Sequence, residues 1–421
     1  MKYFRTDGIR GEAYKELTLE IANLVGQFYK TSSKKVVIGM DTRASSPDIV
    51  EAIYNGLNGH SDVVVAGVIP TGGLMYYTYV NSCIGIMVTA SHNPYKDNGI
   101  KVIDNGVKID LKEREAIEEF INKHSNFTYQ LTKPYTYEVD EEVNDLYLEF
   151  LESLMIPHKL KVIYDGANGA CSYILKELFS PEEVINCEPN GKNINLNCGS
   201  TNVSSLIQKL KIRKADIGIA FDGDGDRMIV VDKYNRIYEG DFLTYLFAVD
   251  LHERKMLKGN TVVFTEVSNP AIINKLNEIG IHTMITEVGD HHISKALDRE
   301  YVLGGEASGH IINKTLIPFG DGLANAMELL KFLSTSPKKI HEYSYELKLY
   351  HTKTVNISSE GINITEKLRE KVEKYARKKK ITVILRVSGT EKVIRLFIYQ
   401  PKINGMNKNI DKVLKMIRNA R

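Results

Sequence analysis

The chain has 421 residues, of which 43% are hydrophobic and 26% charged, and its formal net charge is +2. This length and composition predict a globular protein of several domains, and the weak net charge excludes the broad electrostatic field with which general nucleic-acid and anionic-membrane binders attract their partners. No run of 18 apolar residues and no apolar signal segment occurs, and the four cysteines form no CxxC pair, so we expect a cytoplasmic protein with reduced thiols.

The N-terminal region alternates helix and strand patterns. Apolar residues at helical spacing predict a helix over residues 18–30, with Thr18 as its N-cap. VVIGMD (36–41) predicts a buried strand, Ser46 before a proline predicts the cap of a second helix, and VVVAG (63–67) predicts the next strand. This alternation is typical of a largely parallel sheet covered by helices.

Two further α/β blocks and a small α+β unit follow. LKVIYD (160–165) predicts the first strand of the second block, and the next residues, 167–179, predict a helix. TVVFT (261–265) begins the third block, in which a helix starts at Asp290. The last stretch predicts a strand, a helix, two strands and a helix. We therefore place four domains, at residues 1–135, 143–240, 241–346 and 347–421.

A strand-like GIMVT (85–89) runs into the segment ASHNP, which contains Ser91 and His92. A serine after a strand can be a turn residue, a helix cap or a nucleophile. His92 raises the possibility of a Ser–His hydrolase, but adjacent residues rarely direct their side chains into one hydrogen bond, and no G-x-S-x-G elbow surrounds Ser91. DNGIKV brings Lys101 near this serine, and RTDGIRG places Arg10 between glycines. Each of these two signals is weak alone.

The strongest motif is FDGDGDR, in which Asp222, Asp224 and Asp226 alternate with glycines between two apolar strands. Three carboxylates this close repel one another unless a cation lies between them, and the glycines allow the backbone to bend so that their oxygens converge. Hard oxygen ligands favour Mg²⁺ or Ca²⁺, and the sequence does not fit an EF-hand Ca²⁺ loop. We therefore predict a Mg²⁺ site with positions open to a phosphate, which Arg227 could orient.

RVSGTEKVIR joins two strands near the C-terminus. Ser388, Gly389 and Thr390 offer hydroxyl and backbone N–H groups in a tight turn, and Arg386 and Arg395 flank them. Such a set is typical of an anion-binding nest, although a plain hairpin turn has the same composition. A phosphate site requires the two arginines to converge.

LGGEASGHII (303–312) carries Glu306, Ser308 and His310 at alternating positions. In an extended loop these side chains would point the same way. A carboxylate and a hydroxyl together match the donors and acceptors of neighbouring sugar hydroxyls. His310 could transfer a proton or contact a phosphate. A metal that needs an anionic ligand, beside an available serine, indicates a phosphoryl group carried on Ser91.

The ordered motifs TASHNP, DGDGDR, GGExSGH and RxSGTE resemble those of the α-D-phosphohexomutase family, from residue 3 to about residue 400. The resemblance implies an α/β fold with three mixed-sheet domains and a smaller C-terminal α+β domain around a central cleft. It also implies a phosphorylated hexose as substrate and one Mg²⁺ per chain.

The resemblance also assigns roles to individual residues. The phosphate carrier would be Ser91, which would hold the metal together with Asp222, Asp224 and Asp226. The groups that transfer protons or stabilise charge would be His92, Arg10, Lys101 and His310. The groups that bind the sugar and its non-reacting phosphate would be Arg227, Glu306, Ser308, Gly309, Arg386, Ser388, Gly389, Thr390 and Arg395.

Within the family, FRTDGIRG, SHNPYKDNGIK, DGANGA and PNGKNIN resemble the branch that acts on glucosamine phosphates. This implies interconversion of glucosamine 6-phosphate and glucosamine 1-phosphate, with glucosamine 1,6-bisphosphate as intermediate and activator, by a monomer or homodimer. Arg5, Ala307, Val387 and Lys392 depart from the usual motifs. The alternatives are the phosphomannomutase/phosphoglucomutase branch, a phosphosugar-binding protein without turnover, and a Mg²⁺-dependent sugar phosphatase.

Overall fold

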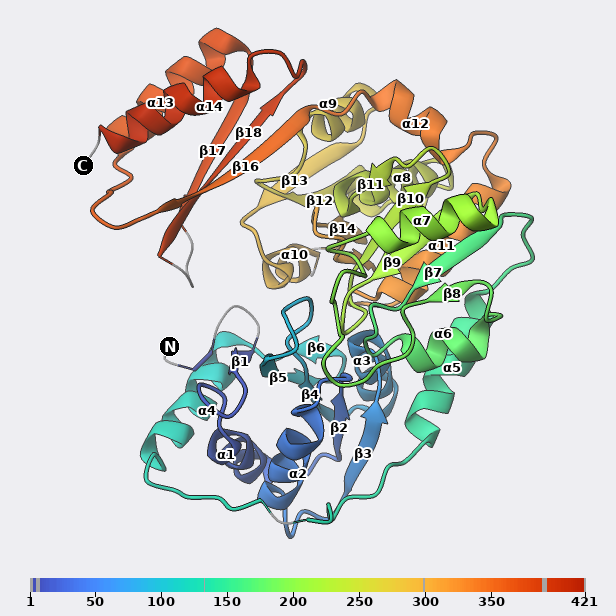
Figure 1. The fold of residues 1–421 in the computed structure, drawn as a ribbon, viewed down its shortest axis with the longest axis vertical. Coiled ribbons are helices and arrows are strands. Elements are labelled where there is room, and N and C mark those ends of the chain that lie inside the picture. Colours follow the sequence, from blue (N-terminus) through green and yellow to red (C-terminus); the bar gives the residue numbers. More distant parts are fainter. Residues whose placement is uncertain (1–2, 5–7, 132, 298–299, 388–391, 420–421) are drawn as a thin grey trace.

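The computed structural model describes residues 3–4, 8–131, 133–297, 300–387 and 392–419. In these residues the strands form four sheets, each built from one continuous part of the chain (Figure 1). Three of the sheets contain both parallel and antiparallel strand pairs, and the last is antiparallel. The predicted fold class, with mixed α/β sheets followed by a small α+β unit, is confirmed. The predicted domain boundaries stay a prediction.

The first sheet has the order β1-β5-β4-β2-β3, with β6 paired to β5. β2 is parallel to both β3 and β4, whereas β5 is antiparallel to its neighbours. Its strands are β1 (Ile9–Glu12), β2 (Val36–Met40), β3 (Val63–Val68), β4 (Ile84–Val88), β5 (Asp97–Asp104) and β6 (Val107–Lys108). Its helices are α1 (Leu19–Tyr29), α2 (Ser46–Gly56), α3 (Thr71–Asn81) and α4 (Leu111–Lys123).

The second and third sheets have the orders β11-β10-β9-β7-β8 and β13-β12-β14-β15. The strands of the second are β7 (Val162–Asp165), β8 (Val184–Ile185), β9 (Ile217–Phe221), β10 (Met228–Asp232) and β11 (Ile237–Tyr238), with helices α5 (Glu142–Leu154), α6 (Ser172–Leu178) and α7 (Ser204–Arg213). The strands of the third are β12 (Thr261–Thr265), β13 (His282–Thr286), β14 (Leu303–Gly305) and β15 (Ile311–Asn313). Its helices are α8 (Gly240–Glu253), α9 (Pro270–Glu278), α10 (Asp290–Leu297), α11 (Gly322–Thr335) and α12 (Ile340–Leu347), with a 3₁₀ turn at Lys258–Asn260.

The C-terminal unit is a three-stranded sheet of order β16-β18-β17. Two helices cover one of its faces, and the unit lies at one end of the molecule (Figure 1). Its elements are β16 (His351–Ser358), α13 (Glu366–Lys379), β17 (Thr382–Val387), β18 (Val393–Gln400) and α14 (Met406–Arg418). The predicted order of strand, helix, two strands and helix is confirmed.

One predicted helix cap is confirmed and one is wrong, and one predicted helix begins later than expected. Thr18 caps α1, because its Oγ1 accepts from the N–H of Ile21 at 3.5 Å. The prediction that Ser46 caps α2 is wrong: the N-cap is Ser45, and the Ser46 hydroxyl donates to Asp41 Oδ1 at 3.0 Å. The predicted helix over residues 167–179 begins only at Ser172. Its first residues form a turn in which Ala167 has a φ of 56°, a conformation that no helix contains.

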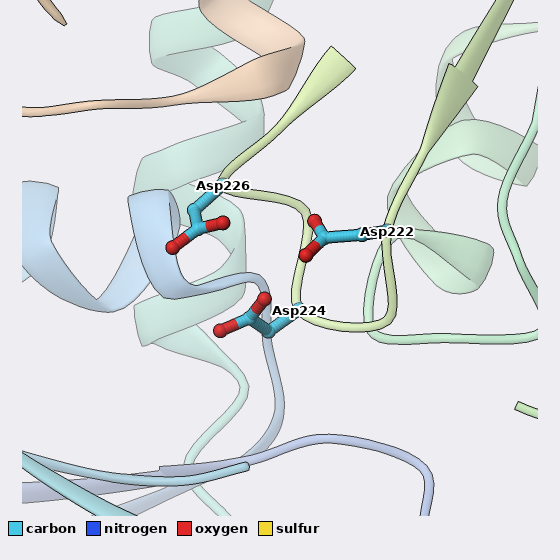
Figure 2. Close-up of side chains that lie close together, drawn as sticks. All are labelled: Asp222, Asp224 and Asp226. Carbon is cyan, nitrogen blue, oxygen red and sulfur yellow. The ribbon is translucent and has the colours of Figure 1, made fainter. Parts of the chain in front are cut away.

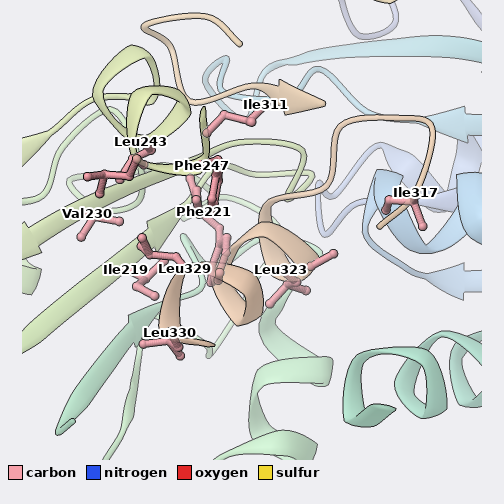
Figure 3. Packing of buried hydrophobic residues seen from close by; sticks show 14 of the residues in the cluster. Ile219, Phe221, Val230, Leu243, Phe247, Ile311, Ile317, Leu323, Leu329 and Leu330 are labelled. Carbon is pink, nitrogen blue, oxygen red and sulfur yellow. The ribbon is translucent and has the colours of Figure 1, made fainter. Parts of the chain in front are cut away.

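One continuous hydrophobic core joins the second and third sheets, includes α5, and reaches α3 and the first sheet of the N-terminal part. Figure 3 shows side chains from β9, β10, α8, β15 and α11 packed together. Fully buried aromatic residues such as Phe221 and Phe247 each contribute about 1.5–3 kcal/mol to stability through their burial. The loop between β9 and β10 is therefore fixed at both ends on a rigid core.

None of the helices in the described residues combines the length and the apolar character needed to cross a bilayer. The four cysteines are free and buried.

Candidate active site

The loop between β9 and β10 brings three carboxylates together. These strands are antiparallel, with Phe221 opposite Met228, so the chain reverses direction within the FDGDGDR motif. Asp222, Asp224 and Asp226 are buried, and each offers an oxygen within 4.8 Å of the others. Figure 2 shows the three carboxylates directed toward a common space. The predicted convergence of the triplet is present.

The described cations affect the three carboxylates of this cluster unequally. Burial, together with repulsion from Asp224 and Asp226, raises the pKa of Asp222 to about 8. Burial also acts to raise the pKa of Asp226, but the positive charges of Lys101, His310 and Arg227 lower it well below its usual range. The buried Oδ1 atoms of Asp224 and Asp226 have no hydrogen-bond partner in the described residues. An all-oxygen set with unsatisfied carboxylate oxygens fits a hard divalent cation such as Mg²⁺.

Ser91 follows β4 and lies against this cluster. Its side chain is buried, and Oγ donates to Asp222 Oδ2 at 2.7 Å. His92 Nδ1 lies 3.2 Å from the same Oγ, so the expectation that neighbouring residues would not share a hydrogen bond is wrong. The backbone of Ser91 has a φ of 52°, which turns the two side chains toward each other. Burial and the positive charges of Arg227 and Arg10 lower the pKa of His92 to about 4, so the ring is neutral near pH 7.

Lys101 is buried at the acidic cluster and not in solvent. It lies on β5 opposite Met87 of β4. Its ammonium group is 2.7 Å from Asp224 Oδ2 and 3.4 Å from Asp226 Oδ2. Arg10 lies on β1, which pairs with the same strand β5. The sequence prediction placed Lys101 near Ser91, and the structure places Lys101 at Asp224 and Asp226, in the same cluster whose third carboxylate, Asp222, contacts Ser91.

Thr71 was missed by the sequence analysis. It is the first residue of α3, and its hydroxyl donates to Asp224 Oδ2 at 2.8 Å. A signal was available, because β3 ends at Val68 and Thr71 follows three residues later, and polar residues at the carboxyl ends of parallel strands commonly line a site.

Arg227 and His310 close the cluster from the other side. Arg227 Nε lies 3.9 Å from Asp222 Oδ2 and 3.7 Å from Asp226 Oδ1. The backbones of Arg227 and His310 form an antiparallel bridge. His310 Nδ1 is 3.6 Å from Asp226 Oδ2, and Nε2 is 3.9 Å from Asp290 Oδ2. Burial alone would lower the pKa of His310, but these two carboxylates raise it.

The GEASGH segment is a hairpin turn between β14 and β15, not the extended loop that we expected. Gly309 has a φ of 98°, and a Cβ there would lie 2.4 Å from Met228 O, so only glycine fits. Glu306 Oε1 accepts from the N–H of Gly289 at 2.8 Å, and Ser308 Oγ donates to Glu306 Oε2 at 3.2 Å. Glu306 and Ser308 therefore lie together as predicted, whereas His310 faces the acidic cluster.

Arg386 and Arg395 occupy matching positions on neighbouring strands. They are register partners in the antiparallel pair of β17 and β18, so their side chains share one face of the sheet. Like charges directly opposite each other are unfavourable unless an anion lies near them. Arg386 Nε is 4.0 Å from Glu266 Oε1, which follows β12. Three residues of the predicted nest, Ser388, Gly389 and Thr390, lie outside the described residues, as does Arg5.

Three segments of the chain match family models. Residues 1–127, 145–235 and 239–350 match the models described as phosphoglucomutase/phosphomannomutase, alpha/beta/alpha domains I, II and III.

Relatives match over nearly the whole chain. The chain is 36% identical to a phosphoglucosamine mutase from Caldicellulosiruptor saccharolyticus, covering 99% of the chain and 98% of the relative. It is 35% identical to a phosphoglucosamine mutase from Zymomonas mobilis, covering 100% and 99%. A crystal structure of a phosphoglucomutase/phosphomannomutase family protein from Burkholderia thailandensis has the same fold, with a TM-score of 0.81, 24% identity and coverage of 100% and 97%.

Proposed function

The chain belongs to the phosphoglucomutase/phosphomannomutase family, and we propose that it is a mutase that interconverts glucosamine 6-phosphate and glucosamine 1-phosphate through a phosphoserine. The observation that carries this proposal is the contact between Ser91 Oγ and Asp222 Oδ2, at 2.7 Å, within the buried carboxylate cluster. This contact supports the proposal, because the hydroxyl proposed as the nucleophile lies beside carboxylates that fit a divalent cation. The relatives named phosphoglucosamine mutase, at about 35% identity over nearly the whole chain, support the amino sugar as substrate.

The reaction consists of two phosphoryl transfers. Phospho-Ser91 first gives its phosphoryl group to O1 of glucosamine 6-phosphate, so the bond from phosphorus to Oγ breaks as the bond to O1 forms. The proton of the sugar O1–H passes to a neighbouring base, for which the neutral ring of His92 is the candidate. His310, whose pKa is raised by neighbouring carboxylates, is the candidate donor of a proton to the departing Ser91 Oγ. The 1,6-bisphosphate then turns over. Ser91 Oγ gives up its proton and takes the phosphoryl group from O6, so the bond from phosphorus to Oγ forms as the bond to O6 breaks, and O6 takes up a proton to leave glucosamine 1-phosphate.

The residues of the cluster have distinct parts in these transfers. Asp222, Asp224, Asp226 and the phosphate on Ser91 would hold Mg²⁺, which supplies positive charge for the transferring phosphoryl oxygens. Lys101 and Arg227 stabilise negative charge from fixed positions in a site that excludes water. Arg10 adds positive charge to the same site.

The remaining predicted residues bind the sugar phosphate. Glu306 and Ser308 bind sugar hydroxyls, in a turn made possible by Gly309. Arg386, Arg395 and the segment 388–390 bind the phosphate that is not being transferred. Because the intermediate turns over, this second site has to accept either end of the sugar, which generic phosphate donors can do.

We further propose glucosamine 1,6-bisphosphate as the activator that phosphorylates Ser91, and a cytoplasmic monomer or homodimer as the working form. The domains at residues 1–135, 143–240, 241–346 and 347–421 are part of the same proposal.

A substrate panel tests the function directly. Purified protein with Mg²⁺ and a trace of the 1,6-bisphosphate is expected to convert glucosamine 6-phosphate to glucosamine 1-phosphate with a kcat/KM at least about tenfold above that for glucose 6-phosphate or mannose 6-phosphate. Product is measured by phosphorus NMR. A preference for glucose or mannose 6-phosphate would assign the chain to the phosphomannomutase/phosphoglucomutase branch, and no turnover of any of them would overturn the proposal.

The arginine pair of the C-terminal unit yields a second prediction. Arg395→Gln is expected to raise KM for glucosamine 6-phosphate about tenfold or more while kcat changes less, because a guanidinium contact to phosphate contributes about 1.5–3 kcal/mol. Lys353→Gln, which removes an exposed cation from β16 of the same sheet, is the control and should leave KM unchanged. Equal KM values for Arg395→Gln and the wild type would remove Arg395 from the phosphate site.

A further inference from the structure

Ser91 has a backbone conformation that serine rarely adopts. Its φ of 52° lies in the left-handed region, where Cβ crowds the following carbonyl. Such a conformation persists only where surrounding contacts hold it, and in enzymes these sites are often functional. Here it directs Oγ to Asp222. The contacts that hold the backbone therefore also decide where the reacting oxygen lies.

Side chains hold both the amide and the carbonyl of Ser91. Its N–H donates to Thr89 Oγ1 at 2.9 Å, and the Thr89 hydroxyl donates to Asp41 Oδ2 at 2.7 Å. Its carbonyl accepts from Arg43 Nη2 at 2.8 Å and from Asn195 Nδ2 at 2.9 Å. These side chains come from three different stretches of the chain.

Arg43 is a fully buried cation with a fixed orientation. Its Nε donates to Asp41 Oδ2 at 2.8 Å, and neither side chain is exposed. Its terminal nitrogens also donate to the carbonyls of Asn93 and Pro94. A buried ion pair of this kind contributes little net stability, because desolvation offsets its attraction. Its value lies in geometry, since the planar guanidinium reaches several carbonyls of the Ser91 loop at fixed angles.

Asn195 connects the Ser91 loop to the second sheet. It lies between β8 and α7, and its own N–H donates to Ala167 O at 2.9 Å. Gly223, between two of the metal-binding aspartates, lies against the same carbonyl, because a Cβ there would be 2.5 Å from Ser91 O. The Ser91 carbonyl is thus held at the acidic loop by groups from both sheets.

We propose that Arg43 and Asn195, here called the Ser91 clasp, are positioning residues that grip the Ser91 carbonyl and keep Oγ at the acidic loop throughout the reaction. This inference rests on the proposed mutase function. In that reaction Oγ is the leaving group of one transfer and the nucleophile of the next, so it has to return to the same place. A small displacement of a reacting atom is enough to slow transfer strongly.

Asn195→Ala tests the clasp, with Asn197→Ala as its matched control. Asn197 is exposed and has nearly the same left-handed backbone, with a φ of 55° against 58° at Asn195, so the control reproduces the backbone cost of the substitution. Asn195→Ala is expected to lower kcat about tenfold or more and to change KM less than about twofold. In the absence of substrate, amide hydrogen exchange in the peptide that contains Ser91 is expected to be faster in this variant. Asn197→Ala should match the wild type in both measurements.

Arg43→Lys is the second variant. It keeps the charge but loses the planar fork, so kcat is expected to fall by at least as much as in Asn195→Ala. Wild-type turnover of glucosamine 6-phosphate, run in parallel, tests the proposed function separately. The exchange measurement needs no turnover, so it decides on the clasp even if that function is wrong. If Asn195→Ala exchanges and turns over like Asn197→Ala, the clasp is refuted.

Discussion

Ser91→Ala is expected to lower mutase turnover by at least about 10³-fold, because removal of a nucleophile that forms a covalent intermediate leaves only the binding and electrostatic contributions of the site. The buried Oγ of Ser91 is the group that contacts the acidic cluster and the neutral His92 ring together. Phosphorus NMR of the glucosamine 6-phosphate reaction measures the loss. Intact-mass spectrometry after incubation with glucosamine 1,6-bisphosphate should show a phosphorylated wild type and an unmodified variant.

The control for this experiment is Ser172→Ala, which removes a buried hydroxyl at the start of α6. The Ser172→Ala protein should keep wild-type turnover and should still be phosphorylated on Ser91. Matching thermal unfolding of all three proteins would exclude a folding defect as the cause. A Ser91→Ala protein that still turns over at a tenth or more of the wild-type rate would mean that another group carries the phosphate.

The sequence was sufficient to predict the parts of the site that depend on local spacing. The Asp-Gly alternation of FDGDGDR predicted convergence of Asp222, Asp224 and Asp226, because glycines permit the reversal and the flanking strands hold its ends. The alternation of Glu306, Ser308 and His310 was misinterpreted, since the positive φ of Gly309 turns the segment back on itself. Period-two spacing predicts a common face only in extended backbone.

The parts that were missed depend on contacts between distant segments. Asp41 was predicted only as the end of a buried strand and Arg43 was not singled out, yet the two side chains form a buried ion pair beyond the end of β2. They are buried because β2 lies parallel to β4 with Met40 opposite Val88, which brings the ends of both strands to one edge of the sheet. The contact of Asn195 with Ser91 spans 104 residues and depends on how two sheets meet. Neither the strand order nor the sheet contact is encoded in a local motif.

Asp222→Asn is expected to lower turnover on the order of 10²- to 10³-fold and to weaken activation by Mg²⁺, because the variant removes a charged ligand from the cation site and replaces the carboxylate beside the Ser91 hydroxyl by a neutral amide. Measurement of kcat against Mg²⁺ concentration checks both effects. The matched control is Asp216→Asn, which replaces an aspartate just before β9 that contacts Lys233 at the surface. It should keep the wild-type Mg²⁺ response, and Asp222→Asn with a normal Mg²⁺ response would refute the metal assignment.

The same variant should change how the metal-free protein responds to pH. The folded pKa of Asp222 is about 8, above the ordinary 3.8, so between these values the folded chain retains a proton that the unfolded chain has lost. The free energy of unfolding of the wild type in EDTA should therefore fall as pH rises from about 6.5 to 8, whereas below about 6.5 the lowered pKa of His92 acts in the opposite direction. Glu239, with a pKa raised to about 7, contributes in the same direction, but it is present in both proteins and cancels in the comparison. Chemical denaturation of Asp222→Asn in EDTA should show a smaller loss of unfolding free energy over this pH range.

Mg²⁺ should stabilise the wild type more at pH 8 than at pH 6.5, because only the ionised carboxylate is a strong ligand. Parallel pH curves for wild type and variant would mean that Asp222 is already ionised without the metal, and that the cluster does not require a cation to hold its charge.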